Sequence, residues 1–227
     1  MMDMSYSKRC VAEGVGTALL LAIVVGSGIM GERLADGNMA IALLANSLAT
    51  GAGLIALILA FWPMSGAHFN PLVTLTSAAL GDRSWRSVPG YLVAQFMGAA
   101  MGVFGAHSMF GLPAFSLSRH ERSGSALVLG EAVATFGLLT IILGNARQGP
   151  RSTAVAVGAY ITAGYWFTSS TSFANPAVTM ARSLTDTFTG IRPTDIPGFL
   201  GGQVAGAVLA LMLFRWVTRS RERRTSA

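Results

Sequence analysis

Long apolar stretches separated by short polar segments are the main pattern of this sequence. Six of them are long enough to cross a bilayer core about 30 Å thick, which takes roughly 20 helical residues. Single carboxylates, Glu13 and Glu131, interrupt the first and the fourth stretch. The pattern predicts an all-α membrane protein with six transmembrane helices. The six stretches cover residues 11–31, 40–62, 88–110, 124–146, 152–168 and 196–214.

Two shorter apolar runs each begin with the dipeptide Asn-Pro. Asparagine is a preferred N-cap and proline suits the first helical position, so each dipeptide predicts a helix start. A charge-free run of about ten residues spans only about 15 Å as a helix, which is half of the bilayer core. The sequence therefore predicts two re-entrant half-helices. The residues that open them are Asn70, Pro71 and Leu72 in the first, and Asn175, Pro176 and Ala177 in the second.

Three landmarks occur twice in the same order, which indicates an internal duplication. They are the buried glutamate, the Asn-Pro dipeptide, and the pattern Pro-Gly-aromatic-Leu-x-x-Gln-x-x-Gly-Ala at residues 89–99 and 197–207. Each half holds three spans, and this odd number makes the second half enter the membrane from the opposite side. We therefore expect inverted 3+3 repeats. The expected boundaries are 1–227 for a single domain, about 10–110 and 124–217 for the repeats, and 215–227 for a basic tail.

Composition and charge narrow the class of protein further. The chain is 52% hydrophobic and 11% charged with a mean hydropathy of +0.55, which excludes an ordinary soluble domain. The net charge of +6 gathers at both ends of the chain and in the loops after the second and fourth spans. By the positive-inside rule, both termini are expected to be cytoplasmic, and the basic tail is a topology signal, not a nucleic-acid site. With Cys10 as the single cysteine, the sequence suggests no disulfide, metal cluster or cofactor.

The two half-helices enter from opposite sides, so their N-termini are expected to meet near the middle of the membrane. Irregular backbone at that depth is tolerated only beside protein or a water-filled cavity, which predicts a pore. Each N-terminus contributes about half an elementary positive charge. We expect Asn70 and Asn175 to donate hydrogen bonds to a neutral solute at the pore centre, while the helix dipoles repel cations. The sequence offers no arrangement of nucleophile, base and orienting group, so no enzyme is expected.

The paired Asn-Pro motifs, the Ser-Gly-Ala-His segment at residues 65–68 and the paired glutamates resemble the aquaporin/glycerol facilitator superfamily, the major intrinsic proteins. The resemblance covers about residues 10–215. It implies a passive channel that forms a homotetramer in the lipid bilayer, with one pore in each subunit. It also implies water, glycerol, urea or neutral metalloid acids as solutes.

In this family a filter of four residues forms the narrowest part of the pore, and the chain departs from the usual pattern there. Val178 stands where an arginine is usual, and Thr50 stands where a bulky aromatic residue is common. Both changes predict a wider and less selective filter. The filter positions implied by the resemblance are Thr50, Tyr165 (with Gly164 as second choice), Phe173 or Ser172, and Val178.

Two further side chains beside the motifs allow alternative placements. Leu72 replaces the usual alanine and adds bulk either at the pore midpoint or against a partner helix. Arg182 lies one turn beyond Val178 on the same helix face, and either reaches back to the pore mouth or pairs with Asp186 or a loop carbonyl.

The second motif, with Val178 and Thr50, more narrowly resembles bacterial aquaglyceroporins of arsenic-resistance operons. That resemblance implies arsenous acid and organoarsenicals as solutes besides glycerol, and a place in the inner (plasma) membrane of a bacterial cell. An ordinary water or glycerol channel with a relaxed filter is the alternative.

The ionisable residues near the motifs have a structural and a functional interpretation. Glu13 and Glu131 either accept hydrogen bonds from the irregular loops or relay protons in a proton-coupled metalloid exporter. His68 either stabilises its loop as a neutral imidazole or senses pH. In the family that the chain resembles, such glutamates support the loops.

Overall fold

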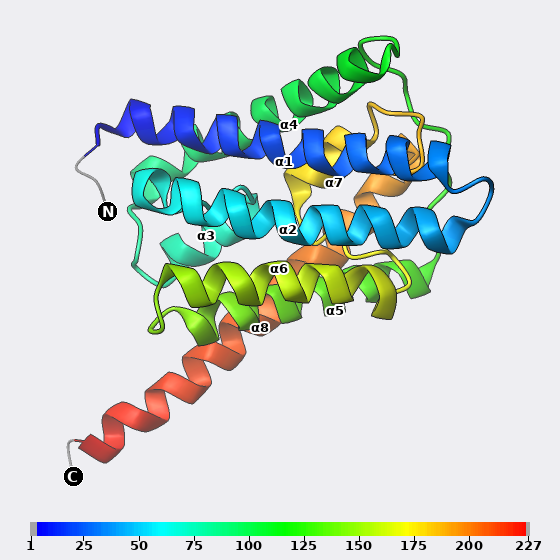
Figure 1. Cartoon of the computed structure of the whole chain (residues 1–227). Coiled ribbons are helices and arrows are strands. Elements are labelled where there is room, and N and C mark those ends of the chain that lie inside the picture. The colour runs from blue at the N-terminus through cyan, green and yellow to red at the C-terminus, as the bar shows by residue number, and fades with distance from the viewer. Residues whose placement is uncertain (1–3, 226–227) are drawn as a thin grey trace.

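The computed structural model describes residues 4–225, and the side chains of residues 4–218. Figure 1 shows long helices that run side by side, with two short helices, α3 and α7, between them. The helices are α1 (Tyr6–Leu34), α2 (Met39–Ser65), α3 (Pro71–Ala79), α4 (Val88–Phe110), α5 (Ser125–Asn145), α6 (Pro150–Phe167), α7 (Pro176–Arg182) and α8 (Ile196–Thr225), with short 3-10 turns at Trp85–Ser87 and Pro193–Asp195.

Small residues let the long helices approach each other closely. A side chain at Gly98 or Gly102 of α4 would collide with the main chain of α1. A side chain at Gly202 or Gly206 of α8 would collide with the main chain of α5 in the same way. Such backbone-to-backbone packing is typical of helices in lipid, where van der Waals contact drives association. The two halves of the chain thus use the same device to pack their first and third long helices.

Six long helices are present, as the hydrophobic pattern predicts, and five of those described are apolar enough by composition to cross a membrane. The exception is α6, whose 18 residues begin with the polar run Pro150-Arg151-Ser152-Thr153. Its place between its neighbours is nevertheless that of a spanning helix, because it lies alongside α2 and α5 (Figure 1).

The two Asn-Pro motifs begin the short helices, but these are shorter than the ten residues expected. Helix α3 has nine residues and α7 has seven. Helix α7 stops at Arg182 because the carbonyls of Ser183 and Leu184 accept hydrogen bonds from Ser118 and Ser116 in the α4–α5 connection. A tertiary contact therefore ends this helix.

The beginning of α1 and the end of α8 lie at the same end of the bundle (Figure 1). The last turns of α8 extend beyond the other helices in the same view. Most of the arginines of the predicted basic tail fall within residues 219–227, whose side chains are outside the described part of the structure.

Candidate functional site

The two Asn-Pro motifs meet at the centre of the bundle, and each asparagine caps its own short helix. The Oδ1 atom of Asn70 accepts a hydrogen bond from the backbone N–H of Leu72 at 2.9 Å. The Oδ1 atom of Asn175 accepts from the N–H groups of Ala177 at 3.0 Å and Val178 at 3.3 Å. These bonds satisfy N–H groups that a helix start leaves free, and they orient both side-chain amides.

The amide NH₂ groups of the same two asparagines cross to the opposite half of the chain. Asn70 donates to the carbonyl of Ala174, and Asn175 donates to the carbonyl of Phe69, each at 2.8 Å. A side-chain amide carries two N–H donors, and each of these bonds uses one. Both asparagines also line the central cavity, so the second donor of each is available to a solute there.

A buried carboxylate holds the loop in front of the first motif. One oxygen of Glu13 accepts from the N–H of His68 at 2.9 Å and from the Ser65 hydroxyl at 2.7 Å. The other accepts from the N–H of Phe69 at 2.8 Å and from the Gln95 side chain at 2.9 Å. The carboxylate is fully buried and does not border the cavity. Its four bonds therefore serve the loop.

The second half repeats this arrangement. The two oxygens of Glu131 accept from the N–H groups of Phe173 and Ala174, each at 2.9 Å. The Gln203 side chain donates to the same carboxylate at 2.6 Å. Glu131 is also fully buried and lies away from the cavity lining.

Two glutamines and two threonines complete these networks, and the sequence analysis assigned them no role. Gln95 also donates to the Thr74 hydroxyl at 2.9 Å, and Gln203 donates to the Thr179 hydroxyl at 2.7 Å. Each threonine hydroxyl in turn donates to the backbone carbonyl of the asparagine that opens its helix. The signal for the glutamines was available, because they belong to the repeated Pro-Gly-aromatic pattern.

The networks hold backbone that is costly for ordinary residues. Ala67 and Phe69 in the first loop have φ values of 51° and 50°, and Ser172 and Ala174 in the second have 53° and 47°. These values lie in the left-handed region, which costs L-amino acids roughly 1–2 kcal/mol each. The hydrogen bonds to the two carboxylates offset this cost and hold both loops in this conformation beside the cavity.

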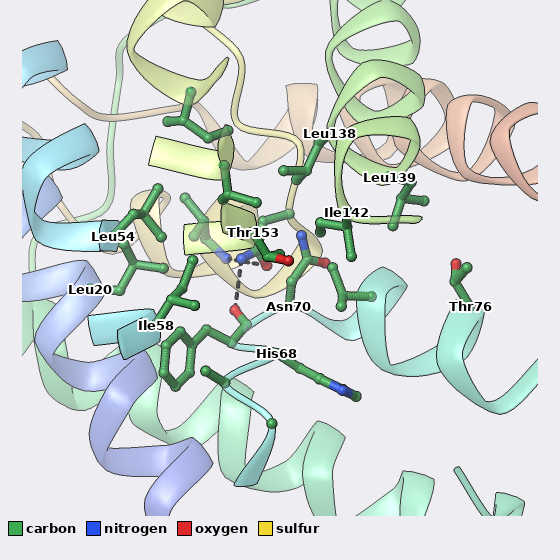
Figure 2. Close-up of a pocket in the computed structure, with 18 of the residues that line it drawn as sticks. Leu20, Leu54, Ile58, His68, Asn70, Thr76, Leu138, Leu139, Ile142 and Thr153 are labelled. Atoms are coloured by element: carbon green, nitrogen blue, oxygen red, sulfur yellow. Dashed lines mark hydrogen bonds between the residues drawn. The ribbon is translucent and has the colours of Figure 1, made fainter. Parts of the chain in front are cut away.

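A cavity of about 430 Å³ passes the two asparagines. Its lining comes from both ends of the bundle and includes residues from α1, α2, α3, α5, α6 and α7. Figure 2 shows Leu54 and Ile58 on one side of Asn70, and Leu138 and Ile142 on the other. The walls are therefore mainly apolar, with polar groups concentrated at the motifs and at the two ends.

The side chains expected to form a filter gather at one end of this cavity. Thr50, Tyr165, Ser172, Phe173 and Val178 all line it and are all buried within the protein. The hydroxyl groups of Thr50 and Tyr165 are hydrogen bonded at 3.2 Å, which joins α2 to α6 across the cavity wall.

The two candidates of the fifth span, and Leu72, lie differently with respect to the cavity. Tyr165 lines the cavity, whereas Gly164 faces Ser172 so closely that a side chain there would collide with it. Leu72 packs with Leu139 and Ala207, away from the cavity lining, so it adds bulk against partner helices.

His68 and Arg182 both border the cavity. The Nδ1 atom of His68 is hydrogen bonded to the Thr74 hydroxyl at 3.0 Å, as a loop-stabilising imidazole would be. The Nε group of Arg182 donates to the carbonyl of Thr189. Arg182 therefore contacts a loop carbonyl, which is one of its expected partners, and the carboxylate of Asp186 binds Arg119 instead.

Asp186 links the connection that follows α7 to the α4–α5 connection. It accepts from the backbone N–H and from the Nε group of Arg119, both at 2.9 Å. These two hydrogen bonds, with the charge of the guanidinium, hold the pKa of Asp186 below its usual value. In the described part of the chain, no group of three or more His, Cys, Asp or Glu residues is placed to hold a metal ion.

Comparisons with known proteins agree with this geometry. The sequence profile of the family described as Major intrinsic protein matches residues 1–164. Aquaglyceroporin AqpS of Rhizobium meliloti (strain 1021) is 51% identical over 96% of this chain and 93% of its own length. A probable aquaporin, AqpM of Archaeoglobus fulgidus, is 31% identical over 96% of this chain and 100% of its own length.

The fold agrees with a solved structure as well. The X-ray structure of the aquaglyceroporin from Plasmodium falciparum superposes with a TM-score of 0.71, covering 92% of this chain and 94% of that one at 22% identity. This likeness shows the aquaporin fold, with its inverted repeat and two half-helices. The chain belongs to the major intrinsic protein family and is a multi-pass membrane channel for small neutral solutes.

Proposed function

We propose that the central cavity is the conduction path and that it passes glycerol, arsenous acid and organoarsenicals in both directions without an energy source. The observation that carries this proposal is the composition of the cavity end, where Val178 and Thr50 stand at positions at which the family usually has an arginine and an aromatic residue. Smaller side chains leave room for solutes larger than water. The aquaglyceroporin name of the relative that is 51% identical supports the same class of solute.

Asn70 and Asn175 act as the donors at the pore centre in this proposal. Each has a free amide N–H and each borders the cavity, with its oxygen turned to its own helix. A solute oxygen can accept from both in passing. A water molecule whose oxygen accepts from both asparagines cannot also accept hydrogen bonds from its neighbours in the file, which breaks a path for proton hopping. Thr50, Tyr165, Phe173 and Val178 form the filter that the solute meets at one end.

Stopped-flow light scattering on proteoliposomes tests the proposal. Flux of glycerol, arsenous acid and a methylated arsenical is expected to be non-saturating and insensitive to a proton gradient. Flux of water and glycerol without flux of the arsenicals would favour an ordinary water or glycerol channel. Accumulation of solute against its gradient would instead indicate a coupled exporter that uses Glu13 and Glu131.

The variant Val178→Arg tests the filter directly. The added side chain is expected to reduce flux of the arsenical and glycerol at least tenfold while water flux stays within about twofold, because the guanidinium narrows the path. Val178→Ile, which adds one methylene, is the matched control and should change each rate by less than about twofold. Equal loss for all solutes, or no loss, would contradict a filter role for Val178.

We further propose one channel domain over residues 1–227, with repeats at about 10–110 and 124–217, assembled as a homotetramer in a bacterial inner membrane with both termini cytoplasmic. The concentration of basic residues at both ends of the chain supports this orientation.

In a Cys10→Ser background, Ser5→Cys should resist and Ser123→Cys should accept a membrane-impermeant maleimide on intact cells. Native mass spectrometry of the purified protein should give four chains, and a monomer would contradict the assembly.

A further inference from the structure

Arg182 is a buried cation on the wall of the cavity. It ends α7 four residues after Val178, so the two side chains lie on one face of that helix. Both border the cavity, and Arg182 is only 2% exposed. The chain therefore has a guanidinium one helical turn from Val178, the position at which the family usually has an arginine.

The side chain of Arg182 is held on two sides. The guanidinium carbon (Cζ) of Arg182 lies 3.4 Å from the centroid of the Phe173 ring, and its Nε group donates to the carbonyl of Thr189. The Phe173 ring in turn packs edge-on against Phe199, with centroids 4.9 Å apart. A guanidinium over an aromatic face is attracted to the ring's negative charge distribution. Phe173 thus positions Arg182.

The two terminal amino groups of Arg182 donate no hydrogen bond to any residue that the structure describes. No salt bridge to Arg182 is present among those residues either. The guanidinium carbon of Arg122 lies 5.1 Å from the centroid of the Phe173 ring and adds a second positive charge nearby. The Glu131 carboxylate already accepts three hydrogen bonds. The acidic side chains of the neighbouring connections pair elsewhere: Asp186 with Arg119, and Glu121 and Asp195 with Arg192.

We infer that Arg182 is a specificity-determining residue of this channel. Its terminal amino groups bind the oxygen atoms of a polyhydroxylated solute, while Val178 leaves space on the same wall for a larger solute. Its fixed charge excludes cations at this point, in addition to any barrier at the pore centre. The cavity wall thus carries a cation one helical turn beyond Val178. This inference rests on the proposed conduction path.

The test compares Arg182→Met with the wild-type channel in proteoliposomes, because methionine keeps an unbranched apolar stem over Phe173 and removes the charge. We expect at least a tenfold rise in K⁺ permeability, read with a potential-sensitive dye, and at least a threefold fall in the ratio of glycerol to water flux. Arg33→Met is the matched control. Arg33 also lies over an aromatic ring, 5.2 Å from the Phe110 centroid, but it does not border the cavity, so less than a twofold change is expected.

Water flux reports whether each variant channel is intact. An Arg182→Met channel that conducts water normally and still excludes K⁺ would overturn the inference. If Arg182→Met does not fold, Arg182→Lys decides, because lysine keeps the charge and the apolar stem but lacks the planar pair of terminal amino groups. Its ratio of glycerol to water flux should fall about threefold to tenfold, the worth of one hydrogen bond, and an unchanged ratio would overturn the inference. Absence of solute flux through the wild-type channel would instead contradict the proposed function.

Discussion

The first re-entrant segment, residues 64–79, and the second, residues 169–182, are held alike at the centre of the molecule and differently at its two ends. At the centre each segment has one buried glutamate, one glutamine and one threonine in the same bonds. The glutamate accepts from consecutive loop N–H groups, and the glutamine joins it to the threonine of the short helix.

At the ends the likeness stops. The first segment continues into a short connection in which Arg83 donates to the Ser65 carbonyl at 2.9 Å and lies over the Tyr91 ring at 3.9 Å. The second continues into a longer connection, residues 183–195, which the α4–α5 connection covers through main-chain bonds. The comparison separates two parts of each segment: the bonds that recur support the loops, and the side chains that differ give the two ends of the cavity different chemistry.

The largest effect is expected where the two segments are alike. Replacing Glu13 or Glu131 with alanine leaves at least two buried loop N–H groups without an acceptor, at about 1–3 kcal/mol for each unpaired group. Each variant should therefore lose about 3–5 kcal/mol or more of stability, measured as thermal unfolding in detergent, together with solute flux. Glu32→Ala, an exposed glutamate at the end of α1, is the control. A large effect in only one of the two variants would contradict the equivalent roles of Glu13 and Glu131.

A smaller effect is expected from the residue at which the two motifs differ. Leu72 is 6% exposed and packs with Leu139 and Ala210, so Leu72→Ala should cost about 2–3 kcal/mol of stability by leaving a cavity. The glycerol-to-water ratio of the folded channel should not change, since Leu72 lies off the pore. Leu72→Met should cost less than about 1.5 kcal/mol. A changed ratio in vesicles would place Leu72 on the conduction path.

The smallest effect concerns the longer connection that follows the second segment. The pKa of Asp186 is below its usual value, so its ionised form stabilises the fold above about pH 4, and this contribution is lost as the pH falls toward the folded-state pKa. The loss should be no more than about 1 kcal/mol, because water screens the pair with Arg119. Unfolding temperatures between pH 3 and 6 should show this dependence in the wild type and lack it in Asp186→Asn. Asp36→Asn should retain it, and an equal response of both variants would contradict the assignment.

Local signals in the sequence predicted most of the fold. Asparagine followed by proline identifies a helix start by its own chemistry, and the caps formed by Asn70 and Asn175 lie where that chemistry puts them. The six apolar stretches predicted the long helices, because composition alone distinguishes a helix in lipid.

The rest depends on contacts between distant segments. Helix α7 ends early because another connection binds the carbonyls that follow it, and no pattern within its own seven residues indicates this. The direction of Arg182 depends on the Phe173 ring and the Thr189 carbonyl, and the exclusion of Leu72 from the pore depends on how α3 is rotated against α5 and α8. Sequence spacing placed both residues on helices without fixing which neighbour they face.

The crossed amide bonds also bear on how the channel is made. Asn70 donates to the carbonyl of Ala174, 104 residues later in the chain, and Asn175 donates to the carbonyl of Phe69, 106 residues earlier. A nascent chain that has inserted only its first three spans has neither partner and no finished passage. The two crossed bonds at the pore centre can therefore form only after both halves of the chain have been made.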